Sequence, residues 1–141
     1  MNKNILVLFS VFFMFSFLSA QSVLGKWKTI DDSTGKARSI IEIYESDGKI
    51  YGKIIELINP KSNNPLCNQC KGDKKNQPII GLIIIDGLSK NDDVYEDGTI
   101  LNPENGKTYD CRLKFEDDED TLQVRGYLAF FYKTQYWKRI K

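Results

Sequence analysis

The residues best suited to chemistry in this chain are three cysteines, Cys67, Cys70 and Cys111. The spacing of Cys67 and Cys70 suits either a structural disulfide or a redox pair. Asn, Pro and Gly surround them with no helical pattern, whereas a thioredoxin-type pair begins a helix. We therefore favour a structural disulfide between Cys67 and Cys70, with Cys111 buried and inert. A bond from either of them to Cys111 is the alternative.

Histidine is absent from all 141 residues, which excludes the commonest catalytic and metal sites. Ser-His-Asp and Cys-His nucleophiles need an imidazole that changes charge near neutral pH. Zinc and copper sites usually recruit histidine, and three cysteines leave a fourth zinc ligand unexplained. The acidic run 116–120 lacks the glycine and alternating spacing of a calcium loop, so it predicts a solvated turn. We expect no catalytic residue, metal or cofactor. An enzyme using redox or carboxylate chemistry is the weakest alternative.

Residues 1–20 predict a signal peptide. Lys3 supplies a positive charge, residues 5–18 are almost continuously apolar, and the small Ala20 precedes the expected cleavage site. The apolar run is shorter than the roughly 20 residues of a membrane-spanning helix. We therefore expect export to the periplasm or secretion, with an uncleaved N-terminal anchor as the alternative. Residues 21–141 then form a single domain with no transmembrane span.

Formal charge gives no attraction to polyanions once the leader is removed. Loss of Lys3 reduces the basic residues from 20 to 19, which equals the 19 acidic residues. A neutral domain has no net field to steer it toward nucleic acid or anionic lipid. We therefore expect no nucleic-acid partner.

Eight short apolar-rich runs, separated by turn residues, predict an all-β domain. The expected strands are residues 24–30, 39–44, 49–58, 80–88, 94–101, 108–115, 122–127 and 131–140. Gly48 follows Asp, Gly106 follows Asn, and each precedes Lys, a pattern typical of tight hairpins. Consecutive hairpins make a meander, and a long meander removes its exposed edges by closing. We expect an up-and-down antiparallel β-barrel of eight strands.

Alternation along the expected strands indicates which side chains face inward. Apolar and charged residues alternate through 109–115, which directs Cys111 inward. Residues 49–58 are apolar on both faces, so either the long loop covers the outer wall or a few isoleucines are exposed. Arg112 and Arg125 also lie within strands, and inward-facing arginines would suit a ligand that carries a carboxylate.

A Gly-x-Trp at residues 25–27 opens the first expected strand and resembles the first-strand signature of lipocalins. The resemblance implies that Trp27 closes one end of the barrel and that Arg139 packs over its indole. Gln135 and Arg139 share one face of the last strand with Trp137. We predict that Trp27, Gln135, Trp137 and Arg139 bind a ligand. The alternative is that they only close the barrel.

A wider resemblance covers nearly all of the expected domain. Its motifs, in order, are Gly25-Lys26-Trp27, Gly48-Lys49-Ile50-Tyr51-Gly52-Lys53-Ile54, Cys67-x-x-Cys70, Pro78-Ile79-Ile80-Gly81-Leu82, Gly87-Leu88, Asn102-Pro103-Glu104-Asn105-Gly106-Lys107-Thr108-Tyr109-x-Cys111, Val124-Arg125-Gly126-Tyr127 and Thr134-Gln135-x-Trp137-x-Arg139. In order and spacing this series resembles the exported bacterial family called domain of unknown function 2147. Tyr95 and Lys133 depart from it, because the family more often has Trp and Arg there. The resemblance implies a lipocalin-like barrel of unassigned activity.

These observations favour a non-enzymatic role in binding. We expect an exported barrel that holds a small apolar or amphipathic ligand. The alternative is a structural or interaction module with a filled barrel that binds an envelope protein. An eight-stranded barrel can be filled by its own side chains, so both interpretations fit the predicted fold.

Overall fold

The protein folds into eight consecutive strands. The computed structural model describes residues 22–141, so the expected signal peptide lies outside the described residues. The elements are β1 (Gly25–Ile30), β2 (Ala37–Ser46), β3 (Lys49–Leu57), the 3₁₀ helix η1 (Gly72–Lys74), β4 (Ile83–Asn91), β5 (Val94–Asn102), β6 (Lys107–Phe115), β7 (Thr121–Leu128) and β8 (Phe131–Arg139). All eight predicted strands are present. The fourth begins at Ile83 rather than at residue 80, because Leu82 turns back to donate a hydrogen bond to the Ile79 carbonyl.

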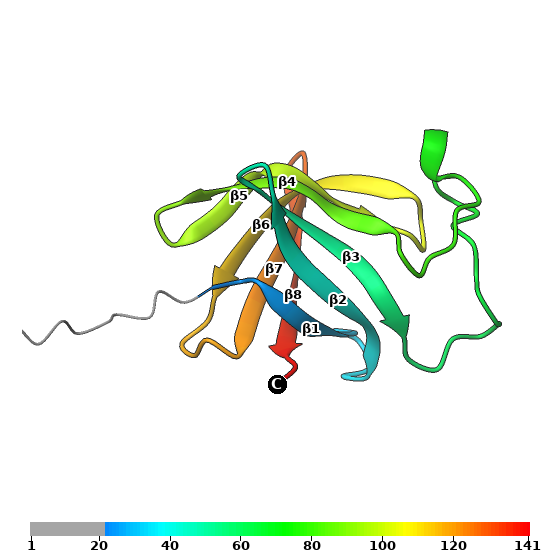
Figure 1. Cartoon of the computed structure of the whole chain (residues 1–141), viewed down its shortest axis with the longest axis horizontal. Helices are drawn as coiled ribbons and strands as arrows, with labels where there is room; N and C mark the ends of the chain where they lie inside the picture. Colours follow the sequence, from blue (N-terminus) through cyan, green and yellow to red (C-terminus); the bar gives the residue numbers. More distant parts are fainter. Residues whose placement is uncertain (1–21) are drawn as a thin grey trace, which may run out of the picture.

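The strands form a closed antiparallel barrel in which every strand pairs with its neighbours in sequence (Figure 1). This confirms the predicted up-and-down barrel. The seam between β1 and β8 is short, with Trp27 paired to Arg139 and Lys28 paired to Lys138. By contrast, β7 and β8 pair along their whole length, from Thr121 to Leu128. The barrel is therefore closed between its first and last strands only at Trp27 and Lys28 of β1.

Alternate connections lie at opposite ends of the barrel, as this topology requires. We call the end formed by residues 31–36, 58–82, 103–106 and 129–130 the loop end. We call the end formed by residues 47–48, 92–93 and 116–120 the acidic end. The turn at 47–48 has φ angles of 49° and 75°, the sign that a two-residue type I′ hairpin turn needs. The hairpin predicted at Gly48 is therefore confirmed.

Large apolar side chains fill much of the interior. Inward-facing residues that are at most 3% exposed include Trp27, Ile41, Ile43, Ile54, Ile85, Leu88, Cys111, Leu113, Leu122, Val124 and Trp137. Gly52 allows two of them to meet, since a Cβ there would lie 3.1 Å from Ile85 and 3.2 Å from Ile41. The predicted inward direction of Cys111 is confirmed.

A second packed layer lies outside the barrel wall. Ile85 pairs with Ile100 across β4 and β5, so the neighbouring Ile84 and Leu101 lie on the opposite, outer face. Both are only 6% exposed, and they belong to the same buried cluster as Cys67 and Cys70. The long connection 58–82 supplies these cysteines and projects beside the barrel in Figure 1. It therefore covers the outer wall at β4 and β5, whereas the outward residues of β3, where the sequence suggested a cover, are only half-buried.

Candidate functional site

Trp27 closes the acidic end of the barrel. Its side chain is fully buried, and its indole Nε1–H donates a 2.8 Å hydrogen bond to the carbonyl of Val23, which precedes β1. Phe115 packs beside it, with ring centroids 6.2 Å apart. With its only polar group already bonded to the backbone, the indole acts here as a plug for the barrel.

Arg139 covers this plug from outside. The guanidinium carbon lies 4.3 Å from the centre of the Trp27 ring, which is the predicted cation–π geometry. Its nitrogens also donate hydrogen bonds to the backbone carbonyls of Ser22, Leu24 and Glu119. The side chain thus ties the entry to β1 to the turn between β6 and β7.

Gln135 and Trp137 form the other half of the predicted ligand-binding group. They are two residues apart on the inner face of β8, where Trp137 pairs with the buried Leu122. The Trp137 Nε1–H donates a 3.1 Å hydrogen bond to Oε1 of Gln135. The structure therefore brings Trp27 into contact with Arg139, and Gln135 into contact with Trp137. The nitrogens of Trp27, Trp137 and Arg139 donate their hydrogen bonds to other groups of the protein. Ligand binding by these four residues stays a prediction.

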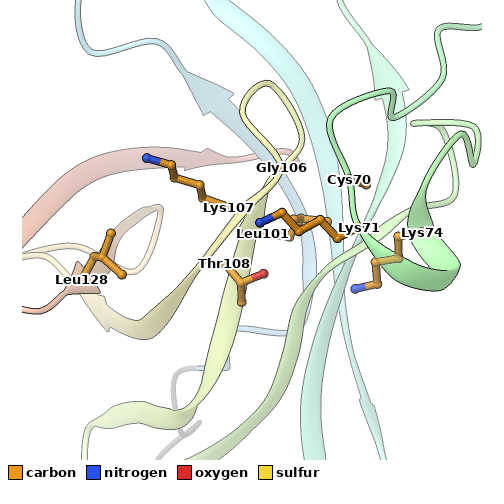
Figure 2. A pocket seen from close by; sticks show the side chains of 8 residues that line it. All are labelled: Cys70, Lys71, Lys74, Leu101, Gly106, Lys107, Thr108 and Leu128. Atoms are coloured by element: carbon orange, nitrogen blue, oxygen red, sulfur yellow. The ribbon is translucent and has the colours of Figure 1, made fainter.

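A hollow of about 360 Å³ opens at the loop end. Figure 2 shows the side chains that line it. The connection 58–82 and the hairpin of β5 and β6 supply most of its lining, and Leu128 at the end of β7 completes it. The full lining comprises Cys70, Lys71, Lys74, Leu101, Gly106, Lys107, Thr108 and Leu128. Its position between three segments explains why no single motif of the sequence indicated it.

The lining has a consistent chemical character. Lys71, Lys74 and Lys107 bring three ammonium groups, and among the described residues that line the hollow none is acidic. Leu101 and Leu128 supply apolar surface beside them. Positive charge beside apolar surface suits a small molecule with an anionic head and a hydrocarbon portion. Lys71 and Lys74 lie in the connection 58–82 and Lys107 begins β6, and no pattern in the sequence marked these three as a site.

The disulfide holds one wall of this hollow in place. Cys67 and Cys70 are bonded to each other, as the favoured pairing predicted, and they are 0% and 2% exposed. Backbone hydrogen bonds from Cys67 N–H to the Gln77 carbonyl and from Asn76 N–H to the Cys67 carbonyl fold the connection around the bond. Burial of both sulfurs withholds them from solvent thiols, which suits a structural staple.

Gly106 brings the opposite wall against the staple. It has a φ of +71°, and a Cβ at this position would overlap the backbone carbonyl of Gln69, which lies between the two cysteines. Cys67 Sγ also lies 3.7 Å from the Pro103 carbonyl oxygen, a further close contact between the connection and this hairpin. Close backbone approach therefore needs glycine at 106, beyond the requirement of the hairpin turn.

Cys111 is a free thiol in the interior. Burial raises its pKa from 9.0 to about 12, because the surrounding apolar side chains disfavour the thiolate. A protonated, enclosed thiol is neither a nucleophile nor a metal ligand at neutral pH. This agrees with the predicted inert role.

Arg112 and Arg125 lie outside the barrel, so the suggestion that they face inward is wrong. They pair directly across β6 and β7, on the face opposite to Cys111 and Val124, because side chains alternate along a strand. They line a second hollow of about 540 Å³ near the acidic end, together with Lys114 and three carboxylates, Asp93, Glu116 and Asp117. Mixed charge makes this hollow less selective for an anion than the one at the loop end.

The fold and the plug define the class of this molecule as an eight-stranded, lipocalin-like barrel. A family model described as "Uncharacterized protein conserved in bacteria (DUF2147)" matches residues 25–139, and the chain belongs to this family. The family predicted from the motifs is thereby confirmed.

A solved structure shares the fold. It is described as "Protein HP1028 from the human pathogen Helicobacter pylori belongs to the lipocalin family". The two chains superpose with a TM-score of 0.73 at 23% identity, over 85% of this chain and 84% of that one. No curated protein matches the sequence. Across residues 22–141, no helix has the length and apolar character needed to cross a bilayer.

Proposed function

We propose that this protein is exported and binds a small anionic amphipathic molecule in the hollow at the loop end. The observation that carries the proposal is the lining itself, in which three lysines adjoin two leucines without a carboxylate among them. A volume of about 360 Å³ lies within the usual range for small-molecule sites. The lipocalin-like barrel supplies a rigid wall, and the stapled connection supplies the opposite wall.

The ligand class follows from the two kinds of side chain. An anionic head placed between Lys71 and Lys107 gains charge-assisted hydrogen bonds, while an attached chain buries apolar surface against the exposed side chain of Leu128. Thr108 adds a hydroxyl that can donate or accept. A fatty acid or a related monoacyl anion has this combination of groups.

Two features support export. Residues 1–20 have the charge and apolar pattern of a signal peptide, and the disulfide between Cys67 and Cys70 is typical of an oxidising compartment. Cell fractionation tests this point. We expect a chain that lacks residues 1–20 in the periplasm or medium, and recovery of the full-length chain in the cytosol would contradict it.

Calorimetric titration with decanoate tests the binding site. We expect wild-type protein to bind decanoate, and to bind decanol and decyltrimethylammonium much more weakly, since these lack the negative charge. The double variant Lys71→Gln/Lys107→Gln should bind decanoate about tenfold more weakly. The matched control Lys26→Gln/Lys28→Gln removes equal charge from outward positions on β1 and should bind like wild type. Equal binding of all three probes would contradict the proposal.

The packed interior favours a second candidate, an interaction module with a filled barrel. Ile41 and Ile85 already meet across Gly52, and Trp27 plugs one end. This candidate predicts no saturable binding of decanoate by wild-type protein, so the same titration separates the two functions.

A further inference from the structure

We propose that the hairpin tip between β7 and β8 inserts into an anionic lipid surface and places the loop-end hollow against it. The proposal rests on the proposed function in one respect, because it makes the bilayer the source of the amphipathic ligand. We call residues 128–132 the aromatic tip. Their sequence is Leu-Ala-Phe-Phe-Tyr.

The aromatic tip exposes large apolar side chains in a short stretch of chain. Phe130 is 100% exposed, Phe131 78%, Tyr132 62% and Leu128 47%. Single exposed apolar residues are ordinary on protein surfaces, but a contiguous group marks a contact surface. A two-residue connection between paired strands holds this group out from the barrel end, a shape suited to entering a bilayer more than to covering a flat protein surface.

The charges of the molecule are separated along the barrel, although their sum over residues 22–141 is zero. The connections of the acidic end contain eight carboxylates and no Lys or Arg, namely Asp47, Asp92, Asp93, Glu116, Asp117, Asp118, Glu119 and Asp120. A net charge of zero therefore does not remove the local electric field at each end of the barrel. The absence of steering toward anionic lipid, expected from the net charge, does not apply to one end of the molecule facing a membrane.

The connections of the loop end contain slightly more lysines than carboxylates. Its connections contain five lysines, Lys36, Lys61, Lys71, Lys74 and Lys75, and four carboxylates, Asp31, Asp32, Asp73 and Glu104. Arg38 pairs with Asp31 and Glu104, and Lys133 lies 4.0 Å from Asp32. Lys107 adds a further charge at the start of β6. The connections of this end sum to +1, against −8 for those of the acidic end, and each lysine near an anionic bilayer adds to the attraction.

Position links the aromatic tip to the hollow. Leu128 is the first residue of the tip and also lines the hollow beside Lys107 (Figure 2). A tip inserted among acyl chains would thus bring Lys71 and Lys107 to the level of the lipid headgroups. An anionic amphiphile could then pass into the hollow without crossing water.

Sedimentation with lipid vesicles tests the proposal. We expect wild-type protein to bind vesicles of equal parts phosphatidylglycerol and phosphatidylcholine, and to bind phosphatidylcholine alone much more weakly. Phe130→Ser/Phe131→Ser should weaken binding to the anionic vesicles by about tenfold or more, because two apolar side chains no longer leave water. Leu24→Ser is the control, since it removes an exposed apolar side chain near the acidic end and should leave vesicle binding unchanged.

Lysine variants test the electrostatic half of the argument. Lys71→Gln/Lys107→Gln should weaken binding to the anionic vesicles by about fivefold for each lysine removed. Lys26→Gln/Lys28→Gln should have a smaller effect. Circular dichroism of each variant checks that the barrel still folds. Equal binding of wild type and the tip variant to anionic vesicles would overturn the proposal.

Decanoate binding without vesicles separates failure of this proposal from failure of the proposed function. Wild type that binds decanoate but not anionic vesicles leaves the function standing and overturns membrane docking. Wild type that binds vesicles through the tip but not decanoate supports docking and contradicts the function. Analytical ultracentrifugation tests whether the aromatic tip instead binds a second copy of the chain. A dimer that Phe130→Ser/Phe131→Ser abolishes would assign the tip to a second copy of the chain and overturn the proposal.

Discussion

Arg139 shows how one side chain can close a barrel. Its guanidinium stacks over Trp27 and donates hydrogen bonds to three backbone carbonyls that come from both ends of the sequence. These carbonyls belong to Ser22, Leu24 and Glu119, which lie outside the strands. A planar group with five donors spread over three nitrogens can stack on the ring and reach all three carbonyls together, whereas an ammonium has three donors on a single atom.

Substitution of Arg139 should therefore weaken the acidic end. We expect Arg139→Ala to lower the free energy of unfolding by about 2–3 kcal/mol, from the lost cation–π contact and charge-assisted hydrogen bonds. Arg139→Lys should recover less than half of this loss. Urea unfolding measures both variants, and a lysine variant as stable as wild type would contradict the role of the planar fork.

Cys111 gives the second prediction at this scale, a loss of stability in alkali. Its pKa is raised from 9.0 to about 12 by burial, so above pH 9 the unfolded chain releases a proton that the folded chain retains. Stability from this thiol is complete below pH 9 and falls as pH rises from there toward 12, by about 1.4 kcal/mol per unit.

Comparison with Cys111→Ala isolates this thiol from the tyrosines and lysines that also titrate in alkali. The alanine variant starts less stable, and the stability difference from wild type should narrow as pH rises above 9. A difference that stays constant from pH 8 to pH 11 would show that the thiol has an ordinary pKa in the folded protein.

At the scale of elements, the connection 58–82 is held by the contact between Gly106 and Gln69. A comparison of two glycines with similar φ angles distinguishes the effect of this contact from the need for a positive φ in the turn. Gly106 has a φ of +71° and Gly48 a φ of +75°, but a Cβ at 48 would meet nothing within 4 Å.

Gly106→Ala should therefore be more harmful than Gly48→Ala. Both variants carry the cost of a left-handed alanine, about 1 kcal/mol. Only Gly106→Ala must also displace the stapled connection, so we expect it to lose at least 1 kcal/mol more and to weaken decanoate binding. Urea unfolding and the decanoate titration measure the two effects. Equal losses of unfolding free energy in the two variants would show that the connection 58–82 can move away from residue 106 at little cost.

The elements were more predictable than the site. Alternation through 109–115 and the turn at Gly48 depend on neighbouring residues, so the strands and the hairpin follow from local pattern. The plug was predicted only with the help of the lipocalin resemblance, because Trp27 and Arg139 are at opposite ends of the chain. The loop-end hollow was missed since Lys71, Lys107 and Leu128 come together only after the barrel has closed.

At the scale of the whole molecule, neutrality conceals a separation of charge. The acidic run 116–120 appears in the sequence as a solvated turn, and in the structure it lies at the end opposite to Lys71, Lys74 and Lys107. A molecule of this kind is oriented by a charged surface even though it has no net charge. Sequence totals could not reveal this property, because it depends on which connections share an end.

The short seam between β1 and β8 also limits when the protein can fold. Trp27 meets Arg139 only after almost the entire chain is present, and contacts between such distant residues form slowly because a long loop must be closed. A ribosome must therefore have made residue 139 before Trp27 can be covered. Until then the first strands lack their last partner, and the barrel of the growing chain cannot close.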